Sequence, residues 1–494
     1  MATSKSPVGE RKIVPRVEGK QNLAAGQKSN AQRLSRPLGL TERVLLERER
    51  TNRWGTVTSA LLLDSAQELN QDHLRKALDL LPKRYPLLRM RITESGNEAC
   101  FEEMENPETV DFEQLDKITA DNWIEGFEEE LNGYLFDIGK GPLWRVRLLK
   151  ETFDEGTFIN GLVFTFLHVI CDALSIFELE KTLLEFLNFL HVGEEFEVES
   201  LPLSPPLESQ SHLIHPNTKE KILFSSFFTL QRTKTFFVKP KNLFLSIYPT
   251  VAKSDPSVRK KTCLLTRSLS EEETKRLIQS CKANECTVHG AITASTHLAV
   301  ARILHKKKDD LKFPLPVDSS YTISLRKDCE PKVSNEEFGA YISASGLTIP
   351  VPLVKPGDEQ GFWKFSRACT REVHTQLETG KHRNLSKLYH CVDIQSYCKI
   401  SNYEFNEGRR TQILNITNCG ALGTNQGEDS HYKFAGSYFG LQGAQTSHTF
   451  GNNIMTVDGR LYWAVEYFPH VTSKTQAKDF FDLTLEILRK ASAD

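Results

Sequence analysis

The sequence lacks the patterns that would identify a protein that binds nucleotides, zinc or nucleic acid. Its 494 residues contain no Walker loop, no GxGxxG fingerprint and no CxxC pair, and the ten cysteines are scattered. Scattered thiols of this kind are typical of a reduced intracellular protein. The formal net charge of −2 gives no overall attraction to nucleic acid. We therefore expect no metal site and no nucleic-acid partner.

Long apolar segments are also missing. The longest, FINGLVFTFLHVI, is too short to span a bilayer, and no apolar segment follows Met1 as a secretory signal requires. We expect a cytoplasmic protein in which the glycosylation sequons at Asn384 and Asn415 are unused. Residues 1–36 carry eight Lys or Arg against two Glu and few apolar side chains, so a disordered basic tail is predicted. A mitochondrial presequence is the alternative, because acids are sparse there.

The chain is too long for one ordinary core, so two lobes are expected. An N-terminal lobe over 37–215 alternates strand and helix patterns, which is typical of an α/β fold. A C-terminal lobe over 259–494 has a capping box near its start, formed by Ser270 and Glu273. One helix of the first lobe is predicted from apolar residues at helical spacing, namely Leu74, Ala77, Leu78 and Leu81.

Residues 216–258 are expected to be a crossover linker between the lobes. From Lys221 to Ser254 this stretch carries seven aromatic residues and no acid. Its apolar side chains either cover the two lobes or form a membrane-facing or tunnel-lining patch, since amphipathic stretches with cationic flanks favour interfaces. Loose membrane contact through residues 222–251 is therefore a hypothesis to test.

The segment FTFLHVICDAL places a histidine, His168, four residues before an aspartate, Asp172. Spacing alone decides little, because His305 and Asp309 repeat it in the charged segment HKKKDDLK, where a solvated helix end or loop is expected. His168 differs in its setting, since an apolar strand leads in and an amphipathic helix leads out. Strand ends surround the crevice of an α/β sheet, where chemistry is commonly placed. His168 is therefore the candidate reactive residue.

Other polar residues near these segments have simpler interpretations. Asp172 suits the N-cap of the helix that begins at Ala173. Cys171 is expected to be a buried structural thiol rather than a nucleophile. His289 and His297 lie eight residues apart on a predicted helix, which is not the i, i+4 spacing of a helical metal site. No metal is assigned to them.

Five segments recur in the order found in one known superfamily. They are LPKRYPLLRMRI, FDIGKGPLWRVRLL, HVICDA, CTVHGAITASTHLA and PVDSSYTISLRKDCEPKVSNEEFGAYIS. On these segments, residues 37–494 resemble the chloramphenicol-acetyltransferase-like superfamily, in the branch of condensation domains, alcohol acetyltransferases and polyketide-associated acyltransferases. The resemblance implies an α/β fold of two lobes, each a mixed sheet with helices, with an active-site tunnel between them.

The superfamily motif is HHxxxDG, and its second, catalytic histidine matches His168. Its aspartate matches Asp172, whereas Leu167 replaces the first histidine and Ala173 replaces the glycine. The resemblance implies that His168 is the general base and that Asp172 pairs with Arg326 of the other lobe. If the replaced glycine adopts a backbone angle that is costly for other residues, the loop at Ala173 is shifted or strained.

The resemblance also implies a reaction. An acyl group would pass from a thioester, preferably acyl-CoA as cosubstrate, directly to a small-molecule alcohol or amine, with no tightly bound cofactor. Thr417 and Asn418, in NITNCGALGT, are candidates for oxyanion stabilisation or for lining the tunnel, or are ordinary turn residues at a strand end. The alternatives are a donor bound to a carrier protein, or a catalytically silent member that binds a lipid or a protein. The sequence leaves the oligomeric state open.

Overall fold

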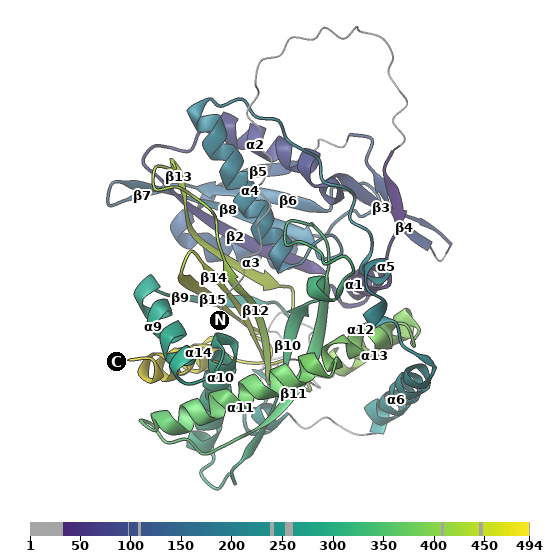
Figure 1. Cartoon of the computed structure of the whole chain (residues 1–494), viewed down its shortest axis with the longest axis vertical. Coiled ribbons are helices and arrows are strands. Elements are labelled where there is room, and N and C mark those ends of the chain that lie inside the picture. The colour runs from purple at the N-terminus through teal and green to yellow at the C-terminus, as the bar shows by residue number, and fades with distance from the viewer. Residues whose placement is uncertain are drawn as a thin grey trace, which may run out of the picture.

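The computed structural model describes residues 33–96, 98–106, 110–237, 242–251, 260–406, 410–443 and 448–493. The strands form two large sheets and a small one of β1, β4 (Glu98–Glu103) and β3 (Met90–Ser95) (Figure 1). The disordered tail predicted over residues 1–36 falls mainly on residues 1–32, which lie outside the described residues. Strand β1, Ser35–Pro37, pairs with β4, so regular structure begins inside the expected tail.

The first large sheet belongs to the N-terminal lobe and has the strand order β13-β2-β8-β6-β5, with β7 paired to β8. These strands are β2 (Thr56–Ser65), β5 (Asp111–Thr119), β6 (Trp144–Lys150), β7 (Thr152–Asp154), β8 (Thr157–Leu167) and β13 (Tyr432–Leu441). Strands β5 and β6 are parallel and the other neighbours are antiparallel, so the sheet is mixed. The helices on it are α2 (Gln71–Arg84) and α4 (Ala173–Val192) on one face and α3 (Trp123–Gly133) on the other. The predicted apolar residues of α2 are all buried.

The second large sheet belongs to the C-terminal lobe and has the order β11-β10-β12-β14-β15-β9. These strands are β9 (Cys263–Leu269), β10 (Leu315–Ser324), β11 (Ile342–Val351), β12 (Leu414–Leu422), β14 (Phe450–Val457) and β15 (Arg460–Tyr467). It is also mixed, because β12 runs parallel to both of its neighbours. The helices packed around it are α9 (Glu271–Ala283), α10 (Val288–Lys307), α11 (Glu359–Glu378) and α14 (Lys474–Ala491). The capping box predicted from Ser270 and Glu273 starts α9.

Strand β13 departs from the expected division into lobes. It comes from the C-terminal half of the chain, yet it pairs with β2 of the N-terminal sheet, from Tyr432 opposite Ser65 to Leu441 opposite Val57. Figure 1 shows this yellow-green strand among the strands of the upper lobe. A lobe defined as residues 259–494 therefore does not describe where β13 lies, because the two halves of the chain interlock.

The segment expected to be a crossover linker, residues 216–258, contains helices α6 (Thr218–Phe237) and α7 (Leu243–Ile247). Its residues 238–241 and 252–259 lie outside the described residues. Helix α6 lies beside α12 (Asn384–Tyr389) and α13 (Ile394–Asn406), and α13 also packs against α1 (Leu40–Asn52) (Figure 1). None of the helices in the described ranges combines the length and the apolar character needed to cross a bilayer.

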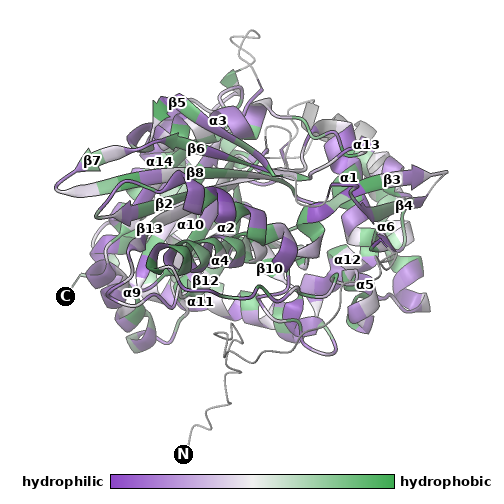
Figure 2. Ribbon diagram, turned by 90° about the horizontal axis from the view of Figure 1, so that it is seen from above, coloured by the Kyte–Doolittle hydropathy of each residue, from purple (hydrophilic) through white to green (hydrophobic). Residues whose placement is uncertain are grey.

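The centre of the molecule is built by β8 and α4. Strand β8 is buried along its last eight residues, which agrees with a strand covered on both faces. Helix α4 follows it and is buried on almost every side, and its mainly green ribbon in Figure 2 shows its apolar character. The short turn between these two elements is consequently held in place by two buried segments. That turn carries His168.

Candidate active site

The turn from β8 to α4 is anchored by its apolar side chains. Val169, Ile170 and Cys171 are fully buried, whereas His168 is only partly buried. The backbone N–H of His168 donates to the carbonyl of Gly55, 2.6 Å away, and this bond ties the turn to the start of β2. The turn therefore holds the histidine on a rigid support of buried side chains. Its imidazole lines a cavity.

The ring of His168 has one nitrogen engaged and one free. Nδ1 lies 2.7 Å from the carbonyl oxygen of Cys171, and a carbonyl oxygen can only accept, so Nδ1 carries a proton. In a neutral imidazole this leaves the lone pair on Nε2, for which the described residues provide no hydrogen-bond partner. Burial lowers the pKa of His168 below its ordinary 6.5, and the Arg48 cation lowers it further, against opposing effects of Cys171 and Asp172. Near neutral pH the ring is therefore an uncharged base.

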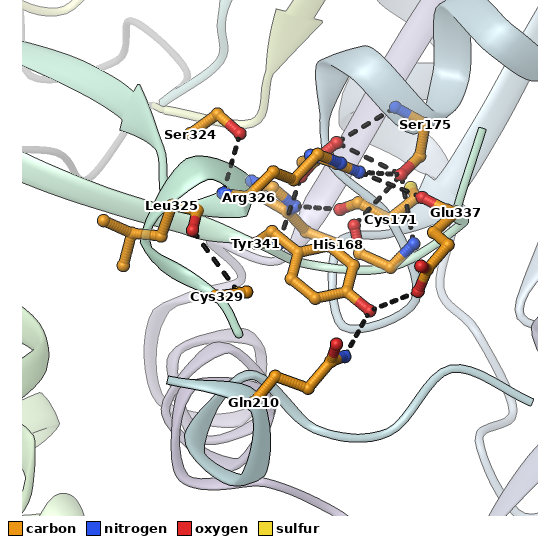
Figure 3. Close-up of polar contacts among 12 residues, drawn as sticks. His168, Cys171, Ser175, Gln210, Ser324, Leu325, Arg326, Cys329, Glu337 and Tyr341 are labelled. Carbon is orange, nitrogen blue, oxygen red and sulfur yellow. Dashed lines mark hydrogen bonds and ion pairs between the residues drawn. The ribbon is translucent and has the colours of Figure 1, made fainter. Parts of the chain in front are cut away.

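Asp172 has two structural roles at once, through its contacts with Ser175, Arg326 and Tyr341, which are labelled in Figure 3. Its Oδ1 accepts the backbone N–H of Ser175 at 3.0 Å, which makes Asp172 the N-cap of α4. Its Oδ2 accepts from Nη1 of Arg326 at 2.5 Å and from the backbone N–H of Tyr341 at 3.1 Å. Burial favours the protonated acid, but Arg326, Ser175 and Tyr341 together hold the pKa of Asp172 below its ordinary value.

Arg326 brings the two lobes together at this point. It follows β10, and its Nη2 donates to the Ser175 hydroxyl at 3.0 Å and to the Glu337 carbonyl at 3.1 Å. The Ser175 hydroxyl in turn lies 3.0 Å from both the N–H and the carbonyl of Gly339. The expected contact between Asp172 and Arg326 is present. Both carboxylate oxygens are thereby engaged, so Asp172 orients the turn and does not bond to the imidazole.

The strain suggested for the turn at Ala173 is absent. Ala173 is the first residue of α4, and it is not one of the non-glycine residues with a positive φ. A helical first position accepts a Cβ without cost, so alanine replaces the motif glycine with no distortion. Cys171 is buried, and burial raises the pKa of its thiol well above the ordinary value, which leaves it protonated and unreactive.

The cavity beside His168 has a volume of about 550 Å³ and lies between the two lobes. One wall is helical, built from α1, α6, α12 and α13, and is mainly apolar. The opposite wall is polar, built from β10, β11 and β12 together with residues of β13, β14 and β15. The tunnel implied by the resemblance corresponds to this cavity.

Thr417 and Asn418 both line the cavity, but their donors differ. They lie within β12 and not in a turn, at a bulge between Asn418 and Ala421. The Thr417 hydroxyl donates to Thr322 at 3.1 Å, so its proton is engaged. Asn418 accepts the N–H of Gly420 through Oδ1 at 2.9 Å, and its side-chain NH₂ forms no hydrogen bond within the described ranges. Of the two, Asn418 retains a donor for a ligand.

The strand wall lies close to the turn that carries His168. Burial, assisted by the negative charge of Asp172, raises the pKa of the Cys419 thiol to about 12, and Arg326 opposes this rise. Cys419 follows Asn418 directly, so the Asn418 region and the Asp172–Arg326 pair share one neighbourhood. Four of the candidates chosen from the sequence, His168, Asp172, Thr417 and Asn418, therefore line a single cavity, and Arg326 contacts it through Asp172.

Three cavity residues were not predicted from the sequence. Arg48 of α1 lies in the charged segment ERVLLERERTN, which has the pattern of a solvated helix face. Glu466 of β15 and His448 also line the cavity, and Glu466 Oε2 lies 3.8 Å from His448 Nε2. Glu466 Oε1 accepts from Asn453 at 2.7 Å. Only the packing of distant segments reveals these positions, so no local pattern could have found them.

The remaining histidines do not form a site. His297 is fully buried and lies within 2.7 Å of the Thr293 carbonyl and 3.0 Å of the Ser319 hydroxyl. Burial lowers the pKa of both His289 and His297 to about 4. His305 lies in the last turn of α10 and does not line the cavity. Within the described ranges, no group of three or more His, Cys, Asp or Glu residues could hold a metal ion.

Several solved structures share the fold of this chain. The trichothecene 15-O-acetyltransferase from Fusarium sporotrichioides matches with a TM-score of 0.69 and 11% identity, over 94% of this chain and 96% of that one. Polyketide synthase associated protein 5 from Mycobacterium tuberculosis matches with a TM-score of 0.60 and 12% identity, over 93% of this chain and 98% of that one. The condensation domain of the Monacolin K polyketide synthase MokA matches with a TM-score of 0.57 and 12% identity, over 93% of this chain and 97% of that one. The predicted fold is confirmed.

The sequence itself matches a family model. No curated protein sequence is significantly similar to the chain. The model for the alcohol acetyltransferase family, in contrast, matches residues 97–486, which include His168, Asp172 and Arg326. The chain therefore belongs to the alcohol acetyltransferase family, and it is an acyltransferase.

Proposed function

We propose that the enzyme transfers an acyl group from acyl-CoA to an alcohol or amine, with His168 as the general base. The single observation that supports this role most directly is the 2.7 Å contact between Nδ1 and the Cys171 carbonyl, because it leaves the lone pair on Nε2. A base needs this tautomer, and a lowered pKa keeps it unprotonated at neutral pH.

The proposed reaction is a direct attack. The acceptor oxygen or nitrogen forms a bond to the acyl carbon while its proton passes to Nε2 of His168. When the tetrahedral intermediate collapses, the C–S bond breaks and Nε2–H returns the proton to the departing thiolate. The products are an ester or amide and a free thiol, and no covalent acyl-enzyme forms. Cys171 takes no part, because its thiol is buried and protonated.

Two further roles follow from the neighbouring contacts. Asn418 is proposed as an oxyanion donor, since its side-chain NH₂ lacks a hydrogen-bond partner within the described ranges and the residue lines the cavity. Asp172 and Arg326 are proposed as positioning residues, because they hold the start of α4 against the second lobe. Neither of them touches the reacting atoms in this mechanism.

The proposal is tested by thiol release. The purified protein would be incubated with acyl-CoA donors from acetyl to octanoyl and with paired alcohol and amine acceptors. We expect CoA release that depends on the acceptor. An absence of release with every pair, from a protein shown to be folded by circular dichroism, would contradict the use of free acyl-CoA.

A carrier-bound donor is the second candidate, and the similarity to a condensation domain favours it. The same acyl group would be offered on CoA and on a phosphopantetheinylated carrier protein. Faster turnover with CoA is expected. Turnover with the carrier alone would replace the first proposal by the second. For a catalytically silent member, the unstrained Ala173 removes one of two supporting features, and the other, the basic tail, lies mainly outside the described residues.

We also propose that the enzyme is cytoplasmic and that α6 rests on a lipid surface, which would make it membrane-peripheral. Ile222, Leu223, Phe227 and Leu230 are each more than half exposed, and at 100° per residue they fall within about 140° of the helix circumference. Lys219 and Lys221 are exposed at its start. Phe227 also lines the cavity, so an apolar substrate could pass between the lipid and the active site.

Vesicle sedimentation tests this second proposal. Wild-type protein should bind phosphatidylcholine vesicles that contain phosphatidylserine, and the double substitution Ile222→Glu and Leu223→Glu should abolish binding. Val192→Glu is the matched control, since Val192 is an equally exposed apolar residue at the end of α4. Equal binding by all three proteins, or no binding by any of them, would contradict the proposal.

A further inference from the structure

Arg48 is a cation in the helical wall of the cavity that contains His168. Of the described residues that line this cavity, Arg48 alone is a lysine or arginine. Its guanidinium is held in place by aromatic neighbours. Nη2 donates to the hydroxyls of Tyr389 and Tyr397, each 3.3 Å away, and the guanidinium carbon lies 4.1 Å from the centre of the Trp54 ring. Its position is therefore defined by uncharged partners.

The charge of Arg48 lacks a counter-ion within the part of the chain that the structure describes. No carboxylate of the described residues lies within ion-pair distance of its guanidinium. The nearest acids in the sequence are engaged elsewhere, since Glu49 accepts the backbone N–H of Gly55 at 2.9 Å and Glu47 accepts the hydroxyl of Thr51 at 3.2 Å. A guanidinium stays protonated in proteins, so the helical wall holds a positive charge with no ion-pair partner among the described residues. The carboxylate of Glu466 also lines the cavity, but it accepts hydrogen bonds from Asn453 and Leu441.

The surroundings of Arg48 make such a charge costly. The same wall contains Val44, Leu45, Leu388 and Ile400. Removing a charge from water without pairing it is unfavourable, and a substrate anion would offset that cost. The N–H groups of Nε and Nη1 make no hydrogen bond to the described residues, so they remain to bind it. The wall is suited to an apolar ligand with one anionic group.

The single guanidinium in this wall indicates which kind of substrate anion it would bind. The phosphates of CoA carry several negative charges, whereas this wall supplies one guanidinium among apolar side chains. A carboxylate carries a single charge and matches the geometry of a guanidinium. We propose that Arg48 binds the carboxylate of an apolar acceptor and so selects hydroxy or amino acids over neutral alcohols. This inference rests on the proposed acyl transfer and adds a substrate class to it.

The two charges of the site are also coupled. The Arg48 cation is near enough to His168 to lower the pKa of the imidazole. A carboxylate bound to Arg48 would cancel that influence and make Nε2 a stronger base when the acceptor is present. Arg48 would then be a specificity residue that also adjusts the base. It acts on the acceptor directly and on His168 through its charge.

The first test measures binding without turnover. Melting temperatures would be recorded with hexanoate and with hexanol, for the wild type, Arg48→Gln and Arg50→Met. Glutamine keeps an amide donor but removes the charge and the guanidinium that lies over the Trp54 ring. Arg50 is a matched control on the same helix, where its ion pair with Glu94 is exposed. We expect hexanoate to stabilise the wild type and Arg50→Met but not Arg48→Gln, and hexanol to affect all three alike.

The second test measures selectivity. The ratio of kcat/KM for 6-hydroxyhexanoate to that for its methyl ester, with acetyl-CoA, should fall at least tenfold in Arg48→Gln, and Arg48→Lys should restore part of it. In a parallel series, hexanol is the acceptor in every assay. There the ratio of kcat/KM for succinyl-CoA to that for butyryl-CoA should be the same in the wild type and in Arg48→Gln. A change in that donor ratio would assign the carboxylate to the acyl group and overturn the assignment to the acceptor.

The outcomes separate the two proposals. If no acceptor is turned over but hexanoate stabilises the wild type through Arg48, the acyl transfer fails and the carboxylate site stands. If Arg48→Gln loses stability and responds to hexanoate as the wild type does, Arg48 only joins α1 to α12 and α13, and the inference is overturned. If Arg48→Gln does not fold, the wild type decides, and stabilisation by hexanoate no greater than that by hexanol would overturn the inference.

Discussion

The two sides of the cavity differ in whether their charged groups are paired within the protein. At the turn that carries His168, beside the strand wall, both carboxylate oxygens of Asp172 are occupied, and Arg326 bonds to groups from both lobes. On the helical wall, the hydrogen bonds of Arg48 to described residues go to uncharged tyrosines, and α6 exposes an apolar face. A closed network holds a base in one geometry, whereas open donors keep interaction energy for a substrate. The comparison separates catalytic positioning from substrate recognition.

The closed network should be costly to open. Arg326→Met leaves the Asp172 carboxylate buried without its cation, so we expect a loss of about 3–5 kcal/mol in the free energy of unfolding. Lys387→Met removes a partly exposed pair on the helical wall, between Lys387 and Glu220, and should cost no more than about 1 kcal/mol. Denaturant unfolding measures both values. Similar losses for the two variants would remove the difference between the walls.

Within the strand wall, the oxyanion donor should affect rate and not stability. Asn418→Ala should lower kcat by about 10²–10³-fold, because its side-chain NH₂ is available to the tetrahedral intermediate. Thr417→Val is the control, since the Thr417 hydroxyl already donates to Thr322. Steady-state kinetics and unfolding of both variants decide this assignment. A larger rate loss from Thr417→Val would show that Asn418 is not the donor.

The smallest expected effect is the pH dependence of the wild type. The base works only when unprotonated, so kcat/KM should rise with pH through the pKa of His168 in the free enzyme and then level off. Because burial lowers that pKa below 6.5, the rise should be complete by neutral pH. Substituting Arg48 by Gln should move the midpoint upward, since it removes a nearby positive charge. A midpoint above about 7 in the wild type would contradict a neutral resting imidazole.

The sequence predicted the network around His168, Asp172 and Arg326 far better than it predicted the helical wall. His168 and Asp172 lie four residues apart in a strand-to-helix turn, and Arg326 lies in a segment of recognisable order, so local pattern and resemblance were sufficient. Arg48 faces the cavity only because α12 and α13, more than 300 residues later, pack against α1. No local periodicity contains that information.

Two expectations that the structure corrects, the lobe of β13 and the strain at Ala173, failed for the same physical reason. Strand β13 has an ordinary strand pattern, but its partner β2 comes from the other lobe, and pairing between distant segments cannot be read from either one. The strain expected at Ala173 assumed a glycine-specific backbone angle, whereas the N-cap at Asp172 places Ala173 in the first helical position. Tertiary context decides both cases.

The most direct measurement compares His168→Ala with His305→Ala. The two histidines have the same spacing to an aspartate, but His305 lies in the last turn of α10 and does not line the cavity. Both variants should fold with wild-type circular dichroism. CoA release by His168→Ala should fall by about 10²–10⁴-fold, as expected for loss of a general base, while His305→Ala should retain wild-type kcat/KM. Wild-type turnover by a folded His168→Ala protein would contradict the assignment of His168 as the base.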